Sequence, residues 1–395
     1  ATSAFATNGS TMIGMGAKTR AMAGVGIGMG HGAESTLSNP ALITNVKSTE
    51  VSFGGTLFMP DVENTNSTSA APGSTDTSTA DMFVIPSISI VSKVNENFYT
   101  GIGMWGTGGL GVDYRNGPNA ALTGAGQMQM VTSLQLMQFG VPLAYKMNNL
   151  SLAITPLIQY GALDINYALP TGPGTSNNVG TGVGSDLSFG YNLGLSYTMD
   201  NITFGAVYKS EIEMKYDGAL RGAVAAMNPA YTNDTLSTPS EIGVGVSYKT
   251  GNHTVAIDYK NIKWSDAMGY KDFGWEDQDV IAIGYEYATE GWAVRVGYSD
   301  SNSAVKDNAG KNLALDVGQP SPGALTNTFN TIGFPGNIET HYALGGTYNI
   351  TDNVSVDLAY VYAPESTTSV TNFAVQNSTV KHSETSYSAQ VNLTF

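Results

Sequence analysis

A period of two in hydrophobicity runs through the chain from about residue 49 to its end. The segment 242–248 places four apolar side chains on one face, namely Ile242, Val244, Val246 and Tyr248. The last residues, 387–395, alternate in the same way and finish on Phe395. Because successive side chains of a β-strand point to opposite faces, this pattern predicts many strands with one apolar face each.

The connections between these segments alternate between short and long. The short turns are 94–97, 146–149, 198–201, 249–252, 288–291 and 350–353, and the long polar segments are 62–80, 108–128, 168–184, 216–237, 265–276, 302–336 and 365–380. Six short turns and seven long segments separate fourteen strands. Short turns at one end, long loops at the other, and Tyr or Trp near strand ends are typical of an outer-membrane barrel.

We therefore predict an all-β protein whose residues 48–395 form a 14-stranded antiparallel transmembrane β-barrel in the bacterial outer membrane. Closure of the barrel also accounts for the C-terminal strand, because pairing with the first strand leaves it no free edge. A soluble β-sandwich is the alternative. It does not explain why so many strands keep a face that is compatible with lipid.

The composition agrees with a barrel and excludes several functions. Charged residues make up 12% of the chain, about half the usual share. The net charge of −15 argues against nucleic acid as a partner, since phosphate backbones require clustered Lys and Arg. The absence of cysteine excludes thiolate metal sites and a disulfide framework. No run of apolar residues approaches the roughly 20 that a membrane helix needs.

Residues 1–47 do not alternate and are rich in Gly and Met. Their larger apolar side chains include Phe5, Met12, Ile13 and Met22. The segment is too short to form a core of its own, while a barrel of more than about eight strands is too wide for its wall side chains to fill. We therefore predict that residues 1–47 form a plug inside the lumen. A disordered periplasmic tail is the alternative.

A short motif at the end of this segment carries a resemblance to a known family. Asn39, Pro40 and Ala41 lie directly before the first strand, and the stretch "GMGAKTRAMAGVG" (14–26) precedes them. This arrangement resembles the FadL family of outer-membrane transporters of long-chain fatty acids and, in some branches, aromatic hydrocarbons. The resemblance covers the whole chain in architecture and about 40 residues in motif.

The resemblance implies passive uptake of hydrophobic molecules, with sideways release through the wall at an inward kink of the third strand. It also implies contact with outer-membrane lipid and lipopolysaccharide, and we expect a monomer without a cofactor. The sequence supplies a physical case for such an opening, because Pro and Gly in strands mark edges, bulges and bends. The candidate opening residues are Pro86, Gly101, Gly103, Gly106, Gly108 and Pro142. Ordinary barrel corners are the alternative.

The ligand path should be apolar and adaptable, which favours Met, Ile and Leu. The candidate ligand-binding residues are Phe5, Met12, Ile13, Met22, Leu134, Leu136, Lys209 and Arg295. Strand parity turns Lys209, Glu211, Glu213 and Lys215 inward on strand seven, and Arg295 inward on strand eleven. A carboxylate head group would pair with Lys209 or Arg295. Ion pairing of these cations with neighbouring acids is an equally good interpretation.

Catalysis is not predicted. The four histidines, His31, His253, His341 and His382, lie in separate parts of the chain and imply no cluster, and no metal-ligand spacing appears. The sequence therefore predicts a channel for passive uptake of hydrophobic molecules such as long-chain fatty acids. A structural, receptor or adhesin barrel without transport is the second hypothesis. A water-filled porin is the third, and it would require residues 1–47 to lie outside the lumen.

Overall fold

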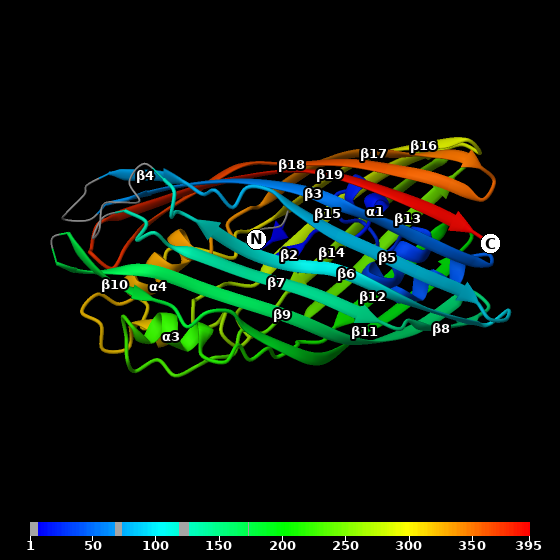
Figure 1. Cartoon of the computed structure of the whole chain (residues 1–395). Coiled ribbons are helices and arrows are strands. Elements are labelled where there is room, and N and C mark those ends of the chain that lie inside the picture. Colours follow the sequence, from blue (N-terminus) through cyan, green and yellow to red (C-terminus); the bar gives the residue numbers. More distant parts are fainter. Residues whose placement is uncertain (1–6, 68–72, 118–125, 173) are drawn as a thin grey trace.

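The computed structural model describes all residues except 1–6, 68–72, 118–125 and 173 (Figure 1). Fourteen strands form the wall, with β7 continued by β8 as one of them. The wall strands are β3 (Thr49–Asn66), β5 (Phe83–Lys93), β6 (Phe98–Asp113), β7 (Val131–Gly140), β8 (Leu143–Met147), β9 (Leu150–Gly172), β11 (Gly184–Met199), β12 (Ile202–Lys209), β13 (Glu241–Thr250), β14 (His253–Ile262), β15 (Gln278–Ala288), β16 (Trp292–Ser301), β17 (Thr340–Thr351), β18 (Val354–Thr371) and β19 (Asn377–Thr394).

Smaller elements lie in the N-terminal segment and in the long loops. The short strands are β1 (Thr7–Asn8), β2 (Thr11–Met12), β4 (Ser74–Thr77) and β10 (Thr175–Val179). The helices are α1 (Ala17–Ala21), α2 (Ser35–Ser38), α3 (Ala219–Ala225) and α4 (Ala324–Thr328), with short 3₁₀ helices η1 (Gly32–Glu34), η2 (Pro40–Asn45) and η3 (Ala314–Asp316) and a π-helical turn η4 (Phe329–Gly333). Among the described residues, no helix has both the length and the apolar character needed to cross a membrane.

The wall closes through its first and last strands. β19 pairs antiparallel with β3 from Ser378 opposite Asn66 to Thr394 opposite Glu50. The C-terminal strand therefore has both edges paired, and the predicted 14-stranded antiparallel barrel is confirmed. All six predicted short turns join wall strands at the right-hand end of Figure 1, where the C-terminus lies. The long loops, with α3 and α4, gather at the opposite end.

Side-chain alternation separates a lipid-facing surface from the lumen. On β14, Val255, Ile257 and Tyr259 point outward and are more than 40% exposed, whereas Ala256 and Asp258 point inward and are buried. An apolar outer face with tyrosines near its border is what a membrane-spanning strand requires. The inward face of such strands is built mostly from small or polar residues, which leaves space inside the barrel.

Two bodies of side chains fill this space. Residues 7–47 lie inside the barrel in the half with the short turns, where α1 packs on β17 and β18 and η2 packs on β9 and β11. The long loops fold into the other half and form a large apolar cluster with the wall. At its centre the rings of Trp264, Tyr270 and Trp275 pack within 5.0 Å of one another. Residues 7–47 and the long loops therefore occupy the two halves of the described lumen.

Candidate functional site

A glycine-rich turn of the N-terminal segment wraps around one carboxylate of the wall. The backbone N–H groups of Gly26 and Ile27 both donate to Asp258 Oδ2 at 2.7 Å, and Gly28 donates to Oδ1 at 3.1 Å. Successive backbone N–H groups that converge in this way form an anion-binding nest. Here the anion is a buried side chain of β14, so the nest fixes residues 26–28 to the wall.

The Asn39-Pro40-Ala41 motif makes a second attachment. Asn39 Oδ1 accepts from the backbone N–H of Ala41 at 3.1 Å and so caps the helical turn η2, which Pro40 begins. Asn39 Nδ2 donates to the carbonyls of Ile27 at 2.8 Å and Leu195 at 3.0 Å. One side chain therefore joins two parts of the N-terminal segment to β11.

Charged side chains connect α1 to the wall on the other side. Arg20 is fully buried, and its Nη2 donates to Ser386 Oγ on β19 at 2.6 Å. Burial lowers the pKa of Arg20 to about 10, and the nearby carboxylate of Glu384 opposes that shift. Glu34 accepts from the backbone of Lys18 and Thr19 and from Gln390 Nε2 at 3.0 Å. Arg20 therefore remains charged at neutral pH and is held by the wall.

Glycines of the wall let the backbone of the N-terminal segment approach closely. A Cβ atom at Gly205 would overlap the carbonyl oxygen of Ile27, and one at Gly297 would overlap the backbone of Met22. At Gly245 it would lie 2.5 Å from the amide nitrogen of Gly28. The small residues on the inward face of these strands are therefore needed for clearance.

Strand β6 leaves its neighbour β5 halfway up the wall. The ladder between them runs from Lys93 opposite Tyr99 to Ser87 opposite Trp105 and then stops, although both strands continue. From Trp105 to Asp113 every residue of β6 is buried, so the alternation of lipid-facing and lumen-facing side chains ends there. The pairing with β7 also shifts register between Gly106 and Gly108. Both observations describe a strand that bends into the lumen.

The hairpin β1–β2 covers the edge of β6 that β5 has left. Thr11 pairs with Gly108, and the Gly109 N–H donates to the carbonyl of Ser10 at 2.9 Å. Met12 packs against Phe58 and Ile85, which fill the space between β5 and the bent strand. The N-terminal segment thus contacts the freed edge of β6 through this one pair and one hydrogen bond, at the point where the wall strands separate.

The six predicted opening residues fall into different surroundings. Gly106 and Gly108 lie at the bend, and Pro86 comes directly before Ser87, the last β5 residue in the ladder, where it offers no N–H to β6. Pro142 lies in the break between β7 and β8, and its carbonyl accepts from Thr100 Oγ1 at 2.9 Å. Gly101 and Gly103 lie within the regular β5–β6 ladder.

Two small cavities lie between the N-terminal segment and the wall. The first, of 40 Å³, is lined by Met15, Leu37, Gly108 and Leu136 among others, and the second, of 30 Å³, is lined by Met12 and Ile13. Lys209 and Glu241 border both cavities. A water needs about 10 to 15 Å³ of such space, and a cavity of about 150 Å³ holds benzene. Neither cavity admits a hydrocarbon in this conformation.

The predicted ligand residues are only partly brought together. Leu136 lines the first cavity, and Met12 and Ile13 line the second. Met22 packs with Val25 and Met29 elsewhere in the N-terminal segment. Leu134 belongs to the large cluster under the long loops, and Phe5 lies outside the described residues.

Both predicted cations have acidic partners in the wall. Lys209 Nζ lies 3.1 Å from Glu241 Oε1, and Arg295 Nε lies 2.7 Å from Glu286 Oε2. Arg295 Nη1 also donates to Thr347 Oγ1 at 2.7 Å. Both cations are therefore engaged in ion pairs with neighbouring acids, as the second interpretation of the sequence predicts.

Two expectations about polar residues are wrong. The strand β12 ends at Lys209, and beyond it Ile212, Met214 and Tyr216 are buried while Glu213 and Lys215 are exposed, because the alternation shifts by one residue near Ser210. Two of the histidines also cluster. His382 Nε2 lies 3.3 Å and His341 Nε2 lies 3.7 Å from the carboxylate of Glu384. These side chains meet because each points into the lumen, His341 from β17 and the other two from β19.

Sequence reasoning missed the residues that hold the N-terminal segment. Asp258 stands alone as an inward-facing acid in "TVAIDY", opposite a run of glycines far away in the chain. That combination was a usable signal, because glycine-rich turns expose several N–H groups to one anion. Ile85 and Trp105 carried no signal, since their role depends on where β5 and β6 part.

Comparison with known proteins agrees with this architecture. The family model described as "Outer membrane protein transport protein (OMPP1/FadL/TodX)" matches residues 1–314. A search of curated protein sequences finds no match. Among solved structures, a Pseudomonas aeruginosa FadL homologue has a TM-score of 0.72 at 14% identity, covering 97% of this chain and 99% of that chain.

Two further structures have the same fold. The P. putida toluene transporter TodX has a TM-score of 0.69 at 17% identity, covering 97% of this chain and 99% of that chain. The Ralstonia pickettii toluene transporter TbuX has a TM-score of 0.67 at 16% identity, covering 97% and 98%. These identities establish a likeness of fold, whereas the family match spans most of the chain. The chain therefore belongs to the OMPP1/FadL/TodX family of outer-membrane transport proteins.

Proposed function

We propose that this protein is a channel for passive uptake of hydrophobic molecules, with residues 1–47 as its plug and residues 48–395 as its wall. One chain encloses the whole path, so we propose that the channel works as a monomer. The single observation that carries the proposal is the early end of the β5–β6 ladder at Ser87 and Trp105, with the plug hairpin seated on the freed edge.

Transport in this proposal requires movement of the plug hairpin. The cavities of 40 and 30 Å³ are too small for a hydrocarbon, so a solute needs Met12 and its neighbours to withdraw. The hairpin is attached to β6 by the single pair Thr11–Gly108, whereas residues 20–41 are attached by the side chains of Asp258, Asn39 and Arg20. The weaker attachment makes the hairpin the moving part.

The solute then leaves sideways, between β5 and the bent half of β6. Lateral release suits an apolar molecule because it passes directly into hydrocarbon and avoids the aqueous periplasm. On the outer side of β6 a groove of 500 Å³ is lined by apolar residues that include Ile90, Ile102, Phe139 and Ile158. This groove gives the solute an apolar surface next to the proposed exit.

The substrates are neutral hydrophobic compounds in preference to carboxylates. Lys209 and Arg295 already have carboxylate partners, and Lys260 lies in the field of both Glu241 and Asp258. A fatty-acid carboxylate would have to displace one of these acids, whereas a neutral aromatic hydrocarbon needs no cation. TodX and TbuX are described as toluene transporters, which is the same class of solute.

A disulfide across the proposed exit tests the route. A Cβ atom at Gly106 would lie 3.8 Å from Cβ of Ile85, which matches the usual Cβ separation of a disulfide. The chain has no other cysteine. We expect the Ile85→Cys/Gly106→Cys variant to lose at least about tenfold of its labelled toluene uptake when oxidised, and to regain it on reduction.

A second disulfide provides the control. Thr44 Oγ1 lies 2.8 Å from Ser151 Oγ, so Thr44→Cys/Ser151→Cys joins the base of the plug to β9 away from the exit. Uptake by this variant should not depend on its redox state. Equal uptake by the oxidised and reduced exit variant would exclude lateral release at β6. Absence of toluene and oleate uptake by the unmodified protein would instead favour a structural or receptor barrel.

A further inference from the structure

One buried carboxylate of the wall holds the first strand of the hairpin β1–β2. The backbone N–H of Thr7 donates to Glu384 Oε2 at 3.1 Å, and the hydroxyl of Thr7 donates to Oε1 at 3.4 Å. Both residues are at most 2% exposed. Thr11, on the second strand of the hairpin, makes the contact with β6. The two strands of the hairpin are therefore held by separate contacts, one on β19 and one on β6.

Two histidines point at the same carboxylate. His382 Nε2 lies 3.3 Å from Glu384 Oε1, and His341 Nε2 lies 3.7 Å from Oε2. Neither Nε2 atom has a hydrogen-bond partner among the described residues, although both side chains are buried. Buried polar atoms are normally paired, so this group of three side chains requires an explanation.

The protonation of His382 follows from its other ring nitrogen. His382 Nδ1 lies 2.9 Å from the carbonyl oxygen of Pro335, and a carbonyl only accepts, so Nδ1 carries a proton. In neutral His382 the Nε2 lone pair would then face an ionised carboxylate at 3.3 Å, a repulsive contact in a site without water. His382 and Glu384 together therefore bind one proton, on the imidazole or on the carboxyl group, while the hairpin is docked.

Neighbouring positive charges disfavour a second proton in this closed structure. Arg20 of α1 is fully buried and acts electrostatically on Glu384. Lys260 of β14 and Arg20 both act on His341 of β17. Protonation of His341 would add a further positive charge to a water-free site, which is costly. The closed cluster of Glu384, His341 and His382 therefore holds one proton.

We propose that Glu384 is a positioning residue for the hairpin and that its protonation makes closure of the channel depend on pH. When the hairpin withdraws, Thr7 leaves the carboxylate and water reaches the cluster. In water, carboxyl and imidazole groups titrate near their ordinary pKa values of about 4.3 and 6.5. The open cluster then binds about two protons at pH 5 and almost none at pH 8.

The direction of the pH effect follows from these numbers of protons. The state that binds more protons gains stability relative to the other as the pH falls. Between pH 8 and about 6.5 the closed cluster binds more protons than the open one, so acidification favours closure. Below about 6.5 the open cluster binds more, so further acidification favours opening. Closure is therefore strongest near pH 6.5.

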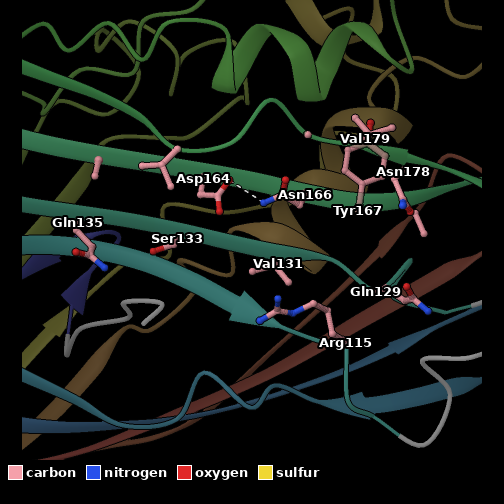
Figure 2. Close-up of a pocket in the computed structure, with 14 residues that line it drawn as sticks. Arg115, Gln129, Val131, Ser133, Gln135, Asp164, Asn166, Tyr167, Asn178 and Val179 are labelled. Carbon is pink, nitrogen blue, oxygen red and sulfur yellow. Dashed lines mark hydrogen bonds between the residues drawn. The ribbon is translucent and has the colours of Figure 1, made fainter.

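An ionisable side chain on the outer face of the wall provides a control. Asp164 lines a polar cavity of 670 Å³, where Asn166 Nδ2 donates to its Oδ1 at 2.7 Å (Figure 2). Leu163 and Ile165, its neighbours in sequence, point into the large apolar cluster of the lumen, so Asp164 faces away from the hairpin. His253, which is exposed at a short turn, is the matching control for the histidines.

Toluene uptake into proteoliposomes between pH 5 and pH 8 tests this inference, which rests on the proposed function. Toluene has no titratable group, so the pH profile reports on the protein. We expect a minimum near pH 6.5 and uptake roughly eightfold higher at pH 5 and at pH 8, because the two states differ by about one proton at both ends. Uptake that is flat or changes in one direction only would overturn the inference and leave the proposed function intact.

Variants separate the two arms of the profile. Glu384→Gln cannot bind the proton, so the alkaline rise should disappear while the acid rise remains. His341→Asn/His382→Asn should lose the acid rise. Asp164→Asn and His253→Asn should keep the minimum. Each variant is first checked for heat-modifiable migration on gels, and a Glu384→Gln profile equal to that of the unmodified protein would exclude the assigned role.

Hydrogen exchange of the peptide that contains residues 7–12 measures hairpin opening without any solute. Corrected for the intrinsic exchange rate at each pH, the exchange should be slowest near pH 6.5 in the unmodified full chain. Exchange that does not vary with pH would overturn the inference even if toluene is not taken up. Absence of toluene uptake at every pH, together with this minimum, would instead count against the proposed function alone.

Discussion

Single residues fix the N-terminal segment to the wall through backbone contacts rather than through large side chains. Asp258 satisfies three N–H groups of residues 26–28, and Gly205 and Gly245 give that backbone room. A buried N–H without an acceptor is costly, so the carboxylate and the glycines act together. The position and size of these residues, more than their hydrophobicity, therefore determine how residues 26–28 lie against the wall.

Removal of the Asp258 carboxylate should loosen this seat. Asp258→Ala leaves three buried N–H groups without their acceptor, which should cost about 3 kcal/mol of plug docking. Hydrogen–deuterium exchange in detergent should then speed up in the peptide that contains residues 26–28. Asp258→Asn keeps one acceptor oxygen and should show a smaller change. Unchanged protection in the Ala variant would contradict the role assigned to this carboxylate.

A methyl group at Gly205 should have a comparable effect for a steric reason. Gly205→Ala places Cβ against the carbonyl of Ile27, and overpacking of this kind costs about 1 to 3 kcal/mol. Limited proteolysis should cut residues 1–47 faster than in the unmodified protein. Gly291→Ala is the control, because no atom lies within 4 Å of its Cβ position. If both variants resist protease equally, the clearance argument fails.

Among the elements, β6 and the hairpin β1–β2 depend on each other. Beyond Trp105, β6 does not pair with β5 and instead pairs with the hairpin. Met12 of the hairpin is 2% exposed and packs beside Phe58 and Ile85. An unpaired strand edge is otherwise exposed backbone that seeks a partner. A reversible contact at this edge is what a gate requires.

Truncation of Met12 should open that contact. Met-to-Ala substitutions in packed cores reduce stability by about 2 to 5 kcal/mol. The two-residue strand β2 has few other contacts that could compensate for this loss. A Thr107→Cys reporter, which lines the adjacent cavity, should react faster with a water-soluble maleimide when Met12→Ala is added. Met12→Leu conserves volume and should leave the rate near that of the reporter alone. Identical rates with Ala and Leu would argue against Met12 as the closing residue.

In the molecule as a whole, the contacts that close the wall do not involve the N-terminal segment. The β19–β3 ladder closes the wall without any residue of 1–47, and the apolar outer face is complete without the plug. A closed barrel in which every wall edge is paired is stable in a bilayer on that basis alone.

Deletion of residues 1–47 should therefore leave a folded wall. The variant should still migrate as a compact, heat-modifiable band in detergent and keep its β-type circular dichroism, because the closing ladder is intact. A chain truncated before Ser388 loses much of that ladder and should not form the compact band. An unfolded deletion variant would show that wall and plug fold as one unit.

The sequence was sufficient to predict the wall because the pattern that indicates each strand lies within that strand. The alternation of residues such as Val255, Ile257 and Tyr259 identifies the lipid-facing side of a strand from its own residues. Turns such as 249–252 indicate where each strand ends. The Asn39 motif could be recognised for a similar reason, since its cap and its proline lie next to each other. These features depend on neighbours in the chain.

The site was not predictable in the same way, because its contacts join residues far apart in sequence. Asp258 meets residues 26–28, and Glu384 meets His341 and Thr7, across more than 40 residues of chain in each case. Parity alone also misassigned Glu213 and Lys215, since one irregular step near Ser210 reverses every later side chain.

The local pattern of side chains thus determined a closed fourteen-strand barrel bathed in lipid, its short and long connections and its small-residue lumen. Only the tertiary structure decided that β6 parts from β5 at Trp105, that the hairpin β1–β2 contacts the freed edge, and that Lys209 and Arg295 are paired with acids. Periodicity reports which face a residue occupies, whereas the partner on that face depends on barrel geometry that brings distant strands and the plug together.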